Sequence, residues 1–210
     1  MNMRIAKHTT FVQMLCALLL LLCPVSLASA GWLIYSKPAF HGRVVDLKTK
    51  EPIEGAVVVA LYKRDPIVSG PAGGGPWVIH AKETLTDEKG EFHIPRYLTI
   101  IQPFAKEGQT SFVIYKAGYS SYPSWAGNPP PFVRSDLFFS KELGAKGEVH
   151  LDSGVVPFTY GIVELLPLAT KEERLRAIPS THPAPGTKEL PLLLKAINEE
   201  GRRYGLGEVR

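Results

Sequence analysis

Aromatic side chains form the strongest candidate binding site in the sequence. They gather with prolines at residues 119–135, and one further ring begins a predicted strand. Flat aromatic faces stack on sugar rings or polyproline segments, and exposed rings anchor protein interfaces. The candidate ligand-binding residues are therefore Trp77, Tyr119, Tyr122, Trp125 and Phe132. The alternative is a small core over one end of the domain, because buried rings stabilise by about 25 cal/mol per Å².

The other reactive residue types give no catalytic signature. His41, His80 and His93 lie in predicted strands, where neutral imidazoles can bind zinc or copper, but no two are spaced i, i+2 on one strand and no HExxH is present. The serines at 120–124 are not part of a Gly-x-Ser-x-Gly elbow. We therefore predict no catalytic residue, no metal and no cofactor. The alternative is a hydrolase whose site is assembled only in three dimensions.

Residues 1–30 are typical of a cleaved signal peptide. Arg4 and Lys7 precede an apolar stretch at 11–23, and a small-x-small site follows at 28–30. The apolar stretch is shorter than the roughly 20 residues that a membrane-spanning helix needs. We expect export to the periplasm or the extracellular space, with no membrane span after cleavage; an uncleaved anchor is the alternative.

The composition excludes several classes of protein. Both cysteines, Cys16 and Cys23, lie in the predicted leader, so the mature chain has no disulfide, cysteine-ligated zinc or thiol catalyst. Without the leader, 22 basic residues face 20 acidic ones, which gives a net charge of +2. This balance argues against nucleic acid as a partner.

The elements that must position the candidate residues are mainly strands. Glycine and proline, 19 and 18 residues, fall in clusters between short apolar runs, which is typical of an all-β protein with long loops. We predict strands at 40–46, 56–63, 77–86, 91–94, 97–104, 111–117, 148–151 and 160–166.

The chain changes character after residue 167. Thr170 and Glu173 have the spacing of a capping box, which predicts a short helix. A second helix is predicted at 187–204, where leucines follow a helical stripe. The stripe can dock on its own domain or on another protein. We favour its own domain, because exposed apolar stripes are uncommon on monomers.

Four short motifs follow one another across residues 40–119. Together they resemble the carboxypeptidase regulatory-like domain family, although the Pro-Gly-x-Tyr turn of that family is absent from 95–109. The resemblance implies a seven-stranded, transthyretin-like (prealbumin-like) Greek-key sandwich and a non-catalytic module. The motifs are Phe40-x-Gly42-x-Val44-x-Asp46, Lys50-x-Pro52-Ile53-x-Gly55-Ala56-x-Val58, Thr86-Asp87-x-x-Gly90-x-Phe92 and Lys116-Ala117-Gly118-Tyr119.

The sequence therefore predicts three parts: a signal peptide at 1–30, an all-β sandwich with long loop insertions at 36–166 and a helical C-terminal extension at 167–210. The expected function is a non-catalytic, exported binding or assembly module of the cell envelope, with an envelope protein or a polysaccharide as partner. A carbohydrate-binding accessory protein that uses the aromatic loop is the alternative.

Overall fold

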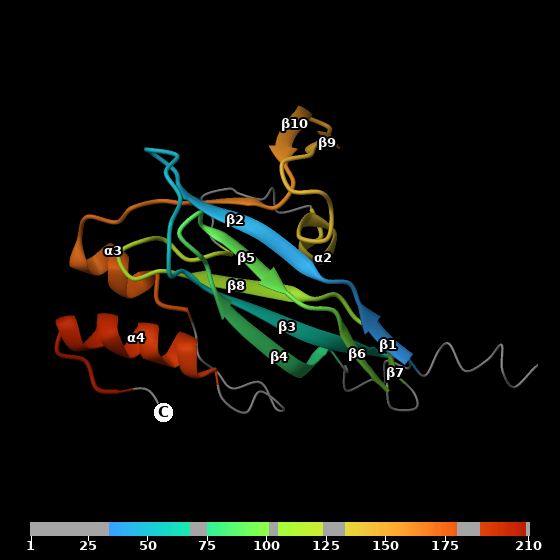
Figure 1. Cartoon of the computed structure of the whole chain (residues 1–210), viewed down its shortest axis with the longest axis horizontal. Coiled ribbons are helices and arrows are strands. Elements are labelled where there is room, and N and C mark those ends of the chain that lie inside the picture. The colour runs from blue at the N-terminus through green and yellow to red at the C-terminus, as the bar shows by residue number, and fades with distance from the viewer. Residues whose placement is uncertain (1–33, 68–74, 101–104, 124–132, 180–189, 209–210) are drawn as a thin grey trace, which may run out of the picture.

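The computed structural model describes residues 34–67, 75–100, 105–123, 133–179 and 190–208. The predicted signal peptide lies outside the described residues, as do Trp125 and Phe132. The described chain is mostly β, with two larger sheets, two strand pairs and a C-terminal helix (Figure 1). No helix among the described residues is long and apolar enough to cross a bilayer.

The first sheet has three strands in the order β11–β2–β5. Strand β2 (Phe40–Asp46) runs parallel to β11 (Ile162–Leu165) and antiparallel to β5 (Glu91–Ile94). The sequence predicted β2 and β5 with these same bounds. Gly90 begins the return into β5 with φ +70°, and a Cβ there would lie 2.4 Å from the Val44 carbonyl oxygen. Only glycine fits this turn.

The second sheet is organised around β3 (Val57–Pro66). One edge of β3 pairs with β4 (Trp77–Leu85), and the other pairs first with β8 (Ser111–Tyr115) and then with β7 (Ala105–Glu107). All three partners are antiparallel to β3. Its central position explains the apolar run that predicted it, because a strand covered on both faces has no polar side.

The main core lies between the two sheets. Phe40 of β2 packs edge-on against Phe112 of β8, with ring centroids 5.0 Å apart. Phe139, which follows a short helix α2 (Ser135–Phe138), packs on Phe112 at 4.4 Å. Aliphatic and aromatic residues from both sheets complete the layer: Val44, Val58, Ala60, Tyr62, Phe92, Ile94, Ile114, Val163 and Leu165.

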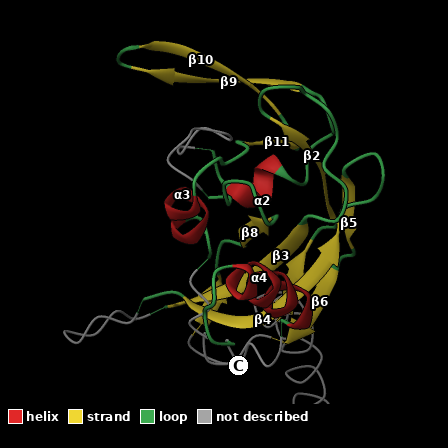
Figure 2. Ribbon diagram, turned by 90° about the vertical axis from the view of Figure 1, so that its left-hand side faces the viewer, coloured by secondary structure: helices red, strands yellow, loops and turns green. Residues whose placement is uncertain are grey.

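A second core covers the outer face of the β3 sheet. Leu193 and Ile197 of helix α4 (Pro191–Arg203) pack on Val57, Val59 and Tyr115. Figure 2 shows α4 lying across the β3 and β4 strands. The prediction that the leucine stripe docks on its own domain is confirmed.

Smaller elements surround the sandwich. Strand β1 (Ile34–Lys37) pairs with β6 (Tyr97–Ile100), and β9 (Lys146–Leu151) pairs with β10 (Gly154–Thr159). Helix α3 (Lys171–Arg176) begins at the predicted capping box. The Thr170 hydroxyl accepts a hydrogen bond from the Glu173 backbone N–H, and the Glu173 carboxylate accepts one from the Thr170 backbone N–H. The sequence prediction did not include β1, β7, β10 or α2.

Candidate binding cleft beside Tyr119

The structure places the three described aromatic candidates in different surroundings. Trp77 pairs with Arg64 at one end of β3, and the Arg64 guanidinium carbon lies 4.3 Å from its ring centroid. Tyr119 follows Tyr115, which pairs with Val57 at the other end of β3. Seven residues of strand separate these ends by about 23 Å.

Tyr122 belongs to the interior. It is 7% exposed, and its ring packs on Phe139 with centroids 6.1 Å apart. Its hydroxyl lies 3.2 Å from the Ser135 hydroxyl oxygen. Burial raises the pKa of Tyr122. The structure thus places Tyr122 in the main core between the sheets, and leaves Tyr119 as the candidate that borders a cavity.

A cleft of about 430 Å³ opens beside Tyr119, within the 300–1,000 Å³ of typical ligand sites. It lies where the loop after β2 meets the turn after β8. All of its lining residues except Thr49 belong to three of the four sequence motifs: Asp46, Thr49, Glu51, Pro52, Ile53, Glu54, Lys116 and Tyr119.

Asp46 shapes the loop on one side of the cleft. Its carboxylate accepts the backbone N–H groups of Lys48 at 2.7 Å and Thr49 at 3.0 Å. These hydrogen bonds, chiefly the one from Thr49, lower the pKa of Asp46, and the Tyr119 hydroxyl contributes a further one. Asp46 therefore stabilises the turn after β2, and its carboxylate is an anion at neutral pH.

Lys116 holds the opposite side of the cleft. Its ammonium donates to the Glu54 carbonyl oxygen at 2.7 Å and lies 3.1 Å from where a Cβ on Gly55 would stand. Gly55 has φ +68°, so a larger residue would be strained there and would also crowd this ammonium. The glycine of the second motif therefore keeps Lys116 in contact with the loop.

The cleft is acidic with one aromatic wall. Three carboxylates, of Asp46, Glu51 and Glu54, outnumber the single ammonium of Lys116. Carboxylates accept hydrogen bonds and attract cations, and a tyrosine face attracts cations or stacks on an apolar ring. The lining thus suits a ligand with cationic or hydroxyl groups.

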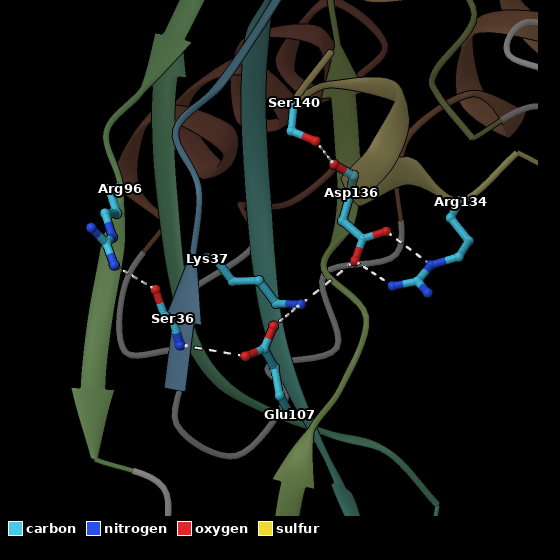
Figure 3. A network of polar contacts seen from close by, with 7 residues as sticks. All are labelled: Ser36, Lys37, Arg96, Glu107, Arg134, Asp136 and Ser140. Atoms are coloured by element: carbon cyan, nitrogen blue, oxygen red, sulfur yellow. Dashed lines mark hydrogen bonds and ion pairs between the residues drawn. The ribbon is translucent and has the colours of Figure 1, made fainter. Parts of the chain in front are cut away.

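A second polar cluster lies at the other end of the sandwich. The Lys37 ammonium, with its side chain 5% exposed, is 2.7 Å from a Glu107 oxygen and 3.5 Å from an Asp136 oxygen. Arg134 binds the Asp136 carboxylate through two nitrogens, at 2.8 and 3.2 Å. Figure 3 shows the ammonium lying between the two carboxylates.

This cluster joins separate elements. Lys37 belongs to β1, Glu107 to β7 and Asp136 to α2, so their contacts fix the β1–β6 pair to the domain. Arg96, next to β6, donates to the Ser36 hydroxyl at 2.9 Å. Because its buried charges are matched within the cluster, we assign it a structural role.

The histidines and serines do not converge. His41 pairs with His93 across β2 and β5, whereas His80 on the other sheet stacks on Tyr97 with ring centroids 4.6 Å apart. No group of three or more potential metal ligands occurs in the described part of the chain. Ser120 accepts the Leu166 amide at 2.9 Å.

Comparisons with known proteins add little. Neither a scan against protein-family models nor a search of the curated proteins found a match. Among solved structures, the chain is similar to a mutant of Acinetobacter radioresistens catechol 1,2 dioxygenase, with 14% sequence identity and a TM-score of 0.29. The match covers 73% of this chain and 57% of the dioxygenase, so the chain spans little more than half its length. We base no inference on this likeness.

Proposed function

We propose that the protein is an exported, non-catalytic binding module of the cell envelope, and that the cleft beside Tyr119 binds a basic segment of an envelope protein. The observation that carries the proposal is the lining of this cleft, in which three carboxylates and a tyrosine ring surround a single ammonium. A lysine or arginine side chain would find charge complementarity and an aromatic face there.

The surroundings of the polar residues support a non-catalytic role. Within the described ranges, no serine hydroxyl is hydrogen-bonded to a histidine. The hydroxyl of Ser140 donates to the Asp136 carbonyl oxygen at 2.7 Å, and that of Ser120 is occupied by a backbone amide. Such hydroxyls stabilise the backbone and have no base beside them to activate a nucleophile.

We also propose that the domain is a carboxypeptidase regulatory-like, transthyretin-like Greek-key sandwich. Three motif glycines support this assignment, since Gly55, Gly90 and Gly118 have φ of +68°, +70° and +89°. Gly55 and Gly90 lie at turns between strands and Gly118 lies at the turn after β8, where the motifs need a residue without a side chain. The three-stranded and four-stranded sheets together supply the seven strands of that fold.

Binding of short charged peptides to the purified chain tests the function. We expect a lysine- and arginine-containing decapeptide to bind and an acidic decapeptide of equal length not to bind, as measured by calorimetry. Tyr119→Ala should weaken binding by about tenfold, because a ring in contact with a ligand is a frequent hot spot. Trp77→Ala, at the far end of β3, is the matched control and should leave affinity unchanged.

Salt separates this function from the carbohydrate alternative, which the aromatic wall and the hydrogen-bond acceptors of the cleft also favour. Binding of a basic peptide should fall steeply between about 0.05 and 0.5 M salt, because the charges are screened. A neutral oligosaccharide would bind independently of salt. If neither probe binds, or if Tyr119→Ala binds the peptide as well as the unaltered chain, the cleft is not the binding site.

A further inference from the structure

The β9–β10 hairpin is the least integrated part of the described fold. Its strands pair with each other and with no other described strand. Figure 2 shows the hairpin projecting from the rest of the molecule. At its base, Phe158 packs on Phe138 with ring centroids 6.1 Å apart, whereas Val155 and Val156 are 52% and 38% exposed. A two-stranded hairpin is marginally stable alone, so an added strand would stabilise it.

Pro157 determines which edge of the hairpin can accept a strand. Proline has no N–H, so it occupies a position whose nitrogen faces away from its ladder. The nitrogen of Pro157 therefore faces the outer edge of β10, and that edge lacks a donor there. Pro157 and Glu148 lie opposite each other, and this pair therefore exchanges no backbone hydrogen bonds within the hairpin. Glu148, and by alternation Lys146 and His150, thus direct their backbone N–H and C=O groups to the open edge of β9.

The side chains of β9 alternate in character. Lys146, Glu148 and His150 are exposed and share one face of β9, and the exposed Asp152 follows in the turn. Val149 and Leu151 lie on the opposite face, where Val149 pairs with Val156 of β10. The polar face thus carries basic and acidic groups in turn, with the His150 imidazole 3.1 Å from the Glu148 carboxylate.

This alternation makes the edge complementary to itself. We propose that a second copy of this chain pairs with the β9 edge, antiparallel, with Val149 opposite Val149 of the second copy. In this register Glu148 lies opposite His150 and Lys146 lies opposite Asp152, twice each by the two-fold symmetry. The backbone groups that face the open edge meet in hydrogen-bonded pairs, as an antiparallel ladder requires.

Neighbouring registers are unfavourable. A shift that places Glu148 opposite Glu148 brings like charges together at the centre, and the opposite shift places Glu148 against Asp152. Like charges directly across a ladder are destabilising. A shift by one residue places polar side chains on the apolar face. The favoured register joins the apolar faces of both hairpins, centred on Val149 and Val156, in one four-stranded sheet.

Sedimentation velocity of the full chain over a range of concentrations tests the proposal. We expect a monomer–dimer equilibrium, weak because the interface is small. Glu148→Lys should weaken the dimer roughly tenfold, since the carboxylate that faces the His150 imidazole is lost twice. His150→Glu should do the same, because it faces Glu148. The double variant Glu148→Lys/His150→Glu should restore association, since the pair is only reversed.

Two further variants separate edge pairing from other contacts. Glu148→Pro removes an N–H from the open edge while leaving the β9–β10 ladder intact, so we expect a monomer with an unchanged thermal midpoint. Ile100→Ser removes the most exposed apolar side chain of the β1–β6 pair, at 79% exposure, and should not change the dimer. A chain that remains monomeric at all concentrations overturns the proposal. So does a dimer that survives Glu148→Pro, or one that fails to recover in the double charge reversal.

Discussion

Asp136 and Glu200 are both acidic residues of the interior, 7% and 0% exposed, but their surroundings differ. Asp136 accepts two hydrogen bonds from Arg134 and lies 3.5 Å from the Lys37 ammonium. Neither carboxylate oxygen of Glu200 accepts a hydrogen bond. Two arginine side chains approach Glu200, that of Arg203 at 3.5 Å and that of Arg174 at 3.8 Å.

The two residues show two ways to stabilise a buried carboxylate: hydrogen bonds at Asp136 and the charges of nearby arginines at Glu200. A buried carboxylate that accepts hydrogen bonds recovers most of what it loses on leaving water, whereas attraction to distant charges recovers less. Asp136 therefore belongs to a network whose loss would leave charges uncompensated. Glu200 is buried on the inner side of α4 at a cost in stability that its arginines only partly offset.

The largest effect should come from breaking the network of Asp136. Lys37→Met keeps the length of the buried side chain but removes its charge, so two carboxylates lose their shared cation. We expect the free energy of unfolding to fall by about 3 kcal/mol, as measured by urea denaturation. Lys106→Met, on the neighbouring exposed position of β7, should change it by less than about 0.5 kcal/mol. Equal effects of the two variants would contradict the structural role of the network.

Replacement of Glu200 should have the opposite sign. In Glu200→Leu an apolar side chain of similar size replaces a carboxylate that accepts no hydrogen bond, and it extends the contacts of Leu193 and Ile197. We expect the free energy of unfolding to stay the same or rise by up to about 2 kcal/mol. Glu199→Leu, at a 51% exposed side chain, is the control. A loss of stability in Glu200→Leu alone would show that the arginine pairing outweighs desolvation.

A third acid, Asp46, extends the comparison because its carboxylate accepts hydrogen bonds from backbone amides. Its folded-state pKa is lowered, so its contribution to stability is present above the unfolded pKa of about 3.9 and is lost as pH falls through the folded value. Asp46→Asn retains one acceptor oxygen, and we expect a loss of about 1 kcal/mol at pH 7. Urea denaturation from pH 7 to pH 3 should show this difference shrinking below pH 4. A difference independent of pH would contradict the assignment.

Local patterns were sufficient to predict much of the fold. Alternation and turn residues predicted β2 and β5 with the observed bounds, and the capping box of α3 is present as expected. The prediction did not include β10, because Pro157 interrupts its pattern, and proline is tolerated there only because its nitrogen faces the outer edge. Strand β7 has three residues, too short to show periodicity.

The candidate site was harder to predict because its parts are joined by tertiary contacts. Tyr119 was named as a candidate, but Asp46 and Lys116 were interpreted only as members of turn motifs. The network of Lys37, Glu107 and Asp136 draws on three distant segments, and no local spacing indicates it. Glu200 lies three residues after Ile197, on the buried side of α4, although an acidic residue type predicts a surface position.

The position of α4 has a consequence for the order of synthesis. Strand β3 comes early among the described elements, whereas the helix that covers its outer face is the last of them. Until α4 arrives, Val57, Val59 and Tyr115 remain uncovered on a newly made sheet. A folding intermediate in this state exposes an apolar surface, and a chaperone that shields it would prevent aggregation until α4 docks.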